Sequence, residues 1–169
     1  MDAISLLWRL DMAGFPQDRL WKKIKAYLQQ HPYEQYIGLN NVHFIYCLAR
    51  LGDDEAVIRA LNAIEAYINT LHPGNMRQLW MKIVLPFCKG VAAYVKGQYS
   101  KAIYFLSPII KDCFQMGGSD AQNDLFLQTY LLCLLKTNKQ EEAKLFFDHY
   151  LSYYRNTPLA EFWFTPCSQ

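Results

Sequence analysis

The chain has 169 residues, of which 52% are hydrophobic and 19% are charged, and its formal net charge at pH 7 is +2. This composition predicts one globular domain with a substantial core and excludes a disordered chain. The short basic cluster Lys22–Lys25 is typical of the solvent-exposed side of an amphipathic helix, so we expect no nucleic-acid partner. Every apolar stretch is shorter than the roughly 20 residues that span a bilayer, so we expect no membrane partner either.

Helical periodicity is nearly continuous, and breaks at glycine, proline or asparagine divide it into eight helices. In chain order these cover residues 3–13, 16–28, 36–51, a fourth from Asp53 or Asp54 to about 71, then 76–96, 99–116, 119–137 and 138–154. Pro86 and Pro108 fall inside the fifth and sixth helices, where we expect kinks. No strand is predicted, because β-branched residues never alternate with period two.

Short breaks between helices predict antiparallel hairpins, at about residues 2–31, 36–72, 75–116 and 119–155, followed by a short aromatic tail over 156–169. The hairpin corners recur at Gly14, Gly52, Gly97 and Asn138, with separations of 38, 45 and 41 residues. A period near 40 is typical of stacked helix pairs. The sequence therefore predicts an all-α domain over 1–169, an α-solenoid of about four helix hairpins.

One copy of the repeat is clear. Small residues at Gly90 and Ala102 let two helices approach closely, Gly97 makes the turn between them, and Tyr99 fills the corner. This arrangement resembles the tetratricopeptide repeat, whereas the copies around Gly52 and Asn138 are degenerate.

Five segments go beyond a generic helical repeat. They are residues 6–14 (with Trp8), 40–44, 85–88, 117–124 and 157–159, and the most specific is Gly117–Gly118–Ser119. In this order, over nearly the whole chain, they resemble the C-terminal half of the tetratricopeptide repeat protein 38 family. The chain departs from that pattern at Asn41, where the family has Asp, and at Asn123, where it has Arg. Family members begin with further repeats, so the resemblance implies an excised domain or a short relative, and it implies no activity.

The five cysteines form neither a C-x-x-C pair nor any metal-binding spacing, and four of them lie in apolar helical runs. The sequence thus predicts free thiols in a reducing compartment, with no disulfide framework. Residues 1–13 lack the apolar region of a signal peptide, because Asp2, Arg9 and Asp11 interrupt it. We expect a cytoplasmic protein.

Asn40, His43 and Cys47 share one face of the third helix. One interpretation is a polar patch that lines a concave groove and binds a partner, and the alternative is an internal network that ties this helix to its neighbour. His43 and Cys47 supply only two metal ligands where a structural zinc site needs four, so we expect no metal.

The segment 117–124 is open to two interpretations as well. Gly117 and Gly118 can adopt positive φ angles, and Ser119 with Gln122 forms a capping box. That leaves Asp120 and Asp124, which share a face with Gln128. They either complement the helix dipole or form an acidic ledge that accepts a His, an Arg or an amide, with His43 as the natural candidate.

These observations predict a non-catalytic interaction or scaffold module, without cofactor, that binds a protein or peptide partner in its concave groove. One alternative is a structural element whose end faces stack on further repeats or on a second copy. Another is an enzyme that uses His43 with Asp120 or Asp124 as a proton-transfer pair.

Overall fold

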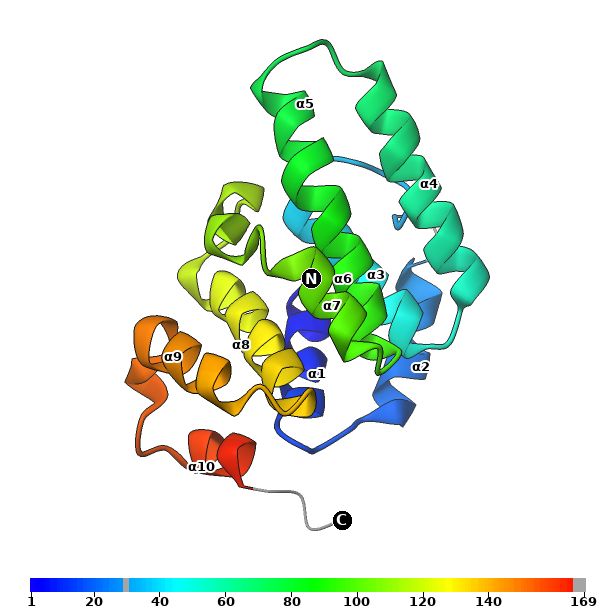
Figure 1. Ribbon diagram of the computed structural model, residues 1–169. Coiled ribbons are helices and arrows are strands. Elements are labelled where there is room, and N and C mark those ends of the chain that lie inside the picture. The colour runs from blue at the N-terminus through cyan, green and yellow to red at the C-terminus, as the bar shows by residue number, and fades with distance from the viewer. Residues whose placement is uncertain (29–30, 166–169) are drawn as a thin grey trace.

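A computed structural model describes residues 1–28 and 31–165, and over these residues the chain is all-helical, without any strand (Figure 1). The elements are α1 (Asp2–Met12), α2 (Asp18–Leu28), α3 (Gly38–Arg50), α4 (Asp54–Thr70), α5 (Asn75–Leu79), the π-helix η1 (Trp80–Val84), α6 (Leu85–Val95), α7 (Tyr99–Leu106), the 3-10 helix η2 (Ile110–Met116), α8 (Asp120–Lys136), α9 (Gln140–Tyr150), the 3-10 helix η3 (Ser152–Tyr154) and α10 (Pro158–Phe164).

The four predicted corners are turns in which the backbone adopts a positive φ. Gly14 has φ 83°, Gly52 and Gly97 have φ 70°, and Asn138 has φ 58°. Glycine and asparagine adopt this conformation at lower cost than other residues, and it reverses the chain after a helix. The helices on either side of the last three corners contact each other as the pairs α3–α4, α6–α7 and α8–α9.

The two internal prolines change the helices in different ways. Before Pro86 the helix widens into η1, where the amide of Leu85 donates to the carbonyl of Trp80, five residues back. This wider turn accommodates a residue that has no N–H and that would collide with the preceding α-helical turn. At Pro108 the predicted helix 99–116 instead ends, with α7 stopping at Leu106 and η2 beginning at Ile110. The predicted kinks are therefore a π-turn and a break.

The predicted close approach within the third hairpin is present between α6 and α7. A Cβ on Gly90 would lie 2.7 Å from Leu106 side-chain atoms and 3.3 Å from the Cβ of Phe105. Ala102 is fully buried, and Tyr99 lies edge-on to Tyr94 at the corner, with ring centroids 5.9 Å apart. The residues that carry the repeat pattern thus determine how closely these two helices pack.

The first helix occupies a position that an open stack of successive hairpins does not predict. α1 contacts α2, but it also contacts α3 and the distant α8. Its apolar stripe of Ile4, Leu7, Trp8 and Met12 is buried, and the Trp8 ring stacks on Tyr46 of α3 with centroids 3.9 Å apart. α1 therefore closes the space between the inner helices α3 and α8 (Figure 1).

The predicted aromatic tail folds back as a helix in its described part. Thr157 caps α10, since its side chain accepts from the amide of Ala160, and Trp163 donates from Nε1 to the carbonyl of Met12 at 3.3 Å. The last residues of the predicted tail, 166–169, and residues 29–30 of the first predicted hairpin lie outside the described residues. The hydrogen bond of Trp163 joins α10 to the last residue of α1.

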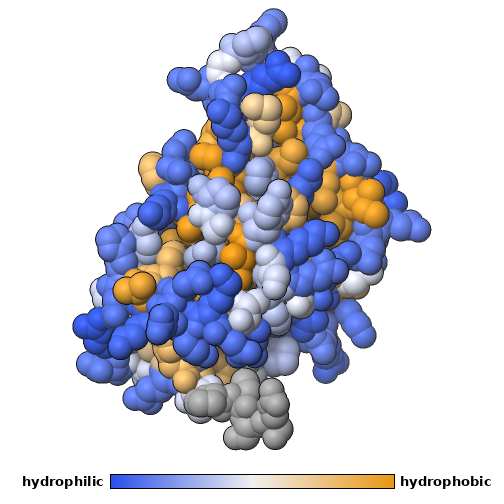
Figure 2. All heavy atoms as spheres, viewed as in Figure 1, coloured by the Kyte–Doolittle hydropathy of each residue, from blue (hydrophilic) through white to orange (hydrophobic). Residues whose placement is uncertain are grey.

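The exposed large apolar residues belong to different elements, and on the face shown in Figure 2 they form separate patches surrounded by polar side chains. Among the described residues no helix has both the length and the apolar character that a membrane crossing requires.

Candidate functional site

His43 of α3 is fully buried. Its Nδ1 is 2.8 Å from the carbonyl oxygen of Leu39, which can only accept, so Nδ1 carries the proton. Its Nε2, 2.8 Å from the Ser5 hydroxyl, then accepts from Ser5 of α1. Burial lowers the pKa of His43 to about 4, because the charged imidazolium would lose its hydration.

The predicted proton-transfer pair is not formed. Both ring nitrogens of His43 are engaged by Ser5 and Leu39, and the ring lies against Trp8 and Phe126, with centroids 5.6 and 5.8 Å away. The ring thus joins α3 to α1. This is the geometry that we expected for His43 if it belonged to an internal network between two helices.

The predicted neighbours of His43 on α3 are not an open polar patch either. Cys47 is fully buried and Asn40 is half-buried. Asn41 is buried as well, and its Nδ2 donates to the carbonyl of Glu34 at 3.1 Å. This face of α3 therefore belongs to the interior.

The predicted capping box at the start of α8 is confirmed. The Ser119 hydroxyl accepts from the amide of Gln122 at 3.4 Å, and the Gln122 side chain accepts from the amide of Ser119 at 2.9 Å. Gly117 and Gly118 adopt φ angles of 88° and 99°. These four residues end η2 and begin α8, which satisfies backbone donors that would otherwise lack partners.

Asp124 is the centre of a buried polar cluster. Its carboxylate accepts from the hydroxyl of Tyr153, from the hydroxyl of Tyr154 at 2.7 Å and from Nε2 of Gln128 at 2.5 Å. The guanidinium of Arg9 lies 3.7 Å away and also donates to the carbonyl of Ala121. Burial, together with this carboxylate, raises the pKa of Tyr154 to about 12. Of the predicted acidic ledge, Asp124 thus pairs with Arg9 from α1 and not with His43, and the amide that it binds is that of Gln128 on the same helix.

Asp120, the other predicted acid, is exposed in the first turn of α8. The first turn is the positive end of the helix dipole, where a negatively charged side chain is favourable. Asp120 and Asp124 therefore have separate environments, although they lie on the same helix four residues apart.

A second cluster holds the opposite side of α1. One oxygen of Asp11 accepts from Nε1 of Trp21, from the hydroxyl of Tyr46 and from Nε of Arg50, at 3.1, 3.0 and 2.9 Å. Arg50 also pairs with Asp18 at 2.5 Å. Charged hydrogen bonds through Arg9 on one side and Asp11 on the other thus fix the rotation of α1 between α8 and α3.

Two of the five predicted partner-binding residues therefore hold α1 in place, His43 through Ser5 and Asp124 through Arg9. His43, Asp124 and Gln128 have relative exposures of 0%, 8% and 2%, so a partner at the molecular surface does not reach them. The predicted contact of these three residues with a partner would require α1 or the segment 152–154 to move.

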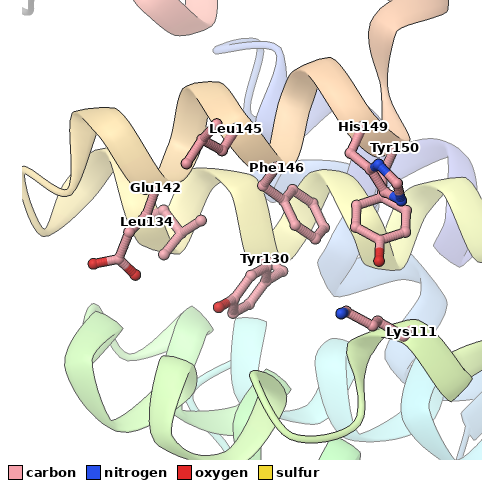
Figure 3. A pocket seen from close by; sticks show the side chains of 8 residues that line it. All are labelled: Lys111, Tyr130, Leu134, Glu142, Leu145, Phe146, His149 and Tyr150. Carbon is pink, nitrogen blue, oxygen red and sulfur yellow. The ribbon is translucent and has the colours of Figure 1, made fainter.

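One open concave feature, of about 430 Å³, lies between α1 and the start of α8, where Ser5, Arg9, Ser119 and Gln122 are among the residues that line it. Another lies between η2, α8 and α9 and has a volume of about 400 Å³. Its lining residues come from these three elements and are shown in Figure 3: Lys111, Tyr130, Leu134, Glu142, Leu145, Phe146, His149 and Tyr150. We call it the α8–α9 groove. Aromatic rings form its wall, since Phe146 lies 4.9 Å from Tyr130 and 4.8 Å from Tyr150, measured between centroids.

The charges of the groove are separated along its length (Figure 3). Lys111 lies near Tyr150 at one end, and Glu142 lies at the other. Glu142 pairs with Lys139 at 2.8 Å, whereas Lys111 has no ion pair or hydrogen bond within the described part of the chain. The groove thus offers one uncompensated positive charge beside an aromatic surface.

Nothing in the described residues forms a metal site, since no three His, Cys, Asp or Glu side chains cluster there. Cys47, Cys88, Cys113 and Cys133 are free and buried, as predicted, and burial raises the pKa of Cys47 and Cys133 to about 12. Their thiols therefore stay protonated and unreactive near neutral pH.

The α8–α9 groove was not predicted from the sequence. The available signal was Leu145, which stands on the helix face opposite Ala143 and Phe147 and is 73% exposed in the structure. Lys111 could not be assigned to the same surface, because only the break at Pro108 brings η2 across from α9.

No protein-family model matches the sequence, and no solved structure matches this chain significantly.

Proposed function

We propose that this chain is a non-catalytic protein-interaction module, built from tetratricopeptide-like helix hairpins, that binds a peptide segment of a partner protein in the α8–α9 groove. The observation that carries the proposal is the groove itself, which joins half-buried aromatic rings and the exposed Leu145 to an unpaired lysine. Pockets that bind peptides combine an apolar surface with a few polar groups that fix orientation.

Helical repeats commonly receive ligands on a concave side, whereas in this chain α1 occupies the space between α3 and α8. Trp8 is fully buried between Tyr46 of α3 and Phe126 of α8. The α8–α9 groove offers a partner an apolar surface, since Leu145 of α9 is 73% exposed and no other element of the described chain covers it.

A selection from phage-displayed random linear peptides tests this proposal. The full chain is the bait, and Leu145→Asp is the comparison, because it places a charge in the groove at an exposed position and leaves the core unchanged. We expect enriched sequences that bind the wild type and lose at least tenfold in affinity for the variant. Enriched peptides that bind both proteins equally, or no enrichment at all, would remove the basis for the proposal.

A second candidate function is stacking through the N-terminal end of the bundle. Phe15 and Tyr27 are 65% and 82% exposed there, and Leu20 is 41% exposed. Light scattering across a concentration series tests this candidate. A dimer that dissociates in Tyr27→Glu would favour it, and a monomer at high concentration would exclude self-association.

A further inference from the structure

We propose that the α8–α9 groove selects a partner segment of defined charge order, with an acidic side chain against Lys111, an apolar side chain in the middle and a basic side chain toward Glu142. This inference rests on the proposed function and specifies the chemistry of its partner. It follows from the separation of charges along the groove (Figure 3).

The Lys111 end is suited to a carboxylate. Lys111 is exposed, stands on η2 across from α9 and has no acidic partner within residues 1–28 and 31–165. Figure 3 shows its amine and the hydroxyl of Tyr150 directed toward the same part of the groove. An ammonium and a phenol hydroxyl can both donate to one carboxylate, and a charged hydrogen bond is stronger than a neutral one.

The middle of the groove is suited to an apolar side chain. Leu134 and Tyr130 form its floor with relative exposures of 1% and 8%, while Phe146 is half-buried and Leu145 stands exposed at the edge. An aliphatic or aromatic side chain placed here removes exposed apolar surface from water.

The Glu142 end disfavours a second acid and favours a base. Glu142 has a side-chain exposure of 57%, and its partner Lys139 is also on the surface, so the pair is weakly held and can be shared with an incoming cation. Glu142 and Tyr150 are eight residues apart on α9, a rise of about 12 Å, which an extended segment of roughly four residues spans. The acidic and basic residues of the partner should therefore be separated by about three residues.

The test uses fluorescein-labelled peptides with acetylated and amidated ends, in which one Asp and one Lys flank Leu-Phe-Ala. Both charge orders are made, because the groove does not fix the direction of the bound chain. The controls are versions in which Asn replaces Asp, and a version that lacks Asp and ends in a free carboxylate. Fluorescence anisotropy with the full chain gives the affinities. We expect one charge order to bind about threefold to tenfold more tightly than its Asn version.

The matched proteins are Lys111→Glu, Glu142→Lys and the double variant that exchanges the two charges. Lys111→Glu should lose the preference for Asp, and the double variant should prefer the opposite charge order. If all peptides bind the wild type equally, or the free-carboxylate peptide alone binds tightly, the charge order is wrong while the groove still binds peptides. If no peptide binds, and the phage selection also fails, the proposed function itself is overturned.

Discussion

His43 is a buried base whose hydrogen bonds require the neutral ring, so its pKa of about 4 makes folding depend on pH. In the unfolded chain the imidazole takes up a proton as pH falls below about 6.5, whereas in the folded chain it does not until about pH 4. The unfolded state therefore binds more protons within this window, and stability falls as pH is lowered through it. We expect a loss on the order of 3 kcal/mol between pH 7 and pH 4 from this residue.

Urea unfolding of the wild type and His43→Gln at several pH values measures this effect. The glutamine variant should be less stable at pH 7 and should lack this part of the pH dependence. A variant with the same pH dependence as the wild type would mean that His43 is not the group responsible.

Asp124 and Asp120 give a matched pair of acids on one helix. Asp124→Asn removes the negative charge that holds Arg9. It also replaces one acceptor oxygen by an NH₂ group, which faces the two tyrosine hydroxyls and the Gln128 amide that donate to Asp124. We expect a cost of about 2–3 kcal/mol in the free energy of unfolding. Asp120→Asn, at an exposed position, should cost less than about 0.5 kcal/mol. Equal effects in chemical denaturation would contradict the assigned environments.

Some residue-level contacts were predictable from the sequence and others were not. The capping pattern of Ser119 and Gln122 was predictable, because a cap involves neighbours three residues apart. The partners of Asp124 were not, since Arg9 and Tyr154 come from opposite ends of the chain. No periodicity in one helix reports which distant helix will face it.

At the scale of elements, Gly90 determines the spacing of α6 and α7. In Gly90→Ala the added Cβ would lie 2.7 Å from Cγ of Leu106, the branch point of a fully buried side chain that cannot move away freely. We expect this strain to outweigh the roughly 1 kcal/mol gain in helix propensity and to destabilise the protein by about 1–2 kcal/mol.

Thermal and urea unfolding compare this variant with Ser100→Ala, which changes an exposed position of α7. The control should stay within about 0.5 kcal/mol of the wild type. A stabilised Gly90→Ala would show that the two helices can separate without loss, and the spacing would then not depend on Gly90.

The helices themselves were largely predictable, and their irregularities were not. Glycine and asparagine corners were read correctly, because a positive φ is a local requirement. Pro86 and Pro108 gave the same signal in sequence, yet one produced a π-turn and the other a break. The difference depends on whether neighbouring helices hold the residues that follow the proline, as α3 and α7 hold α6.

For the whole molecule, the placement of α1 was the main feature that the sequence did not predict. Its apolar stripe is compatible with any helix partner, and the repeat pattern favoured only the next helix in the chain. In the structure its Trp8 joins α3 to α8, and α10 meets the last residue of α1 where Trp163 donates to the carbonyl of Met12. α1 therefore occupies the space between α3 and α8, and the α8–α9 groove lies elsewhere, against η2 and α9.

This closure predicts that α10 stabilises a helix at the other end of the chain. Trp163→Ala removes a side chain with 6% exposure and its hydrogen bond to Met12, at a cost of about 3 kcal/mol. We expect faster amide hydrogen exchange in α1 and α10 but not in α4, which contacts neither of them closely. Glu161→Ala, an exposed change on α10, is the control and should leave α1 protected. Faster exchange confined to α10 would show that the two ends touch without supporting each other.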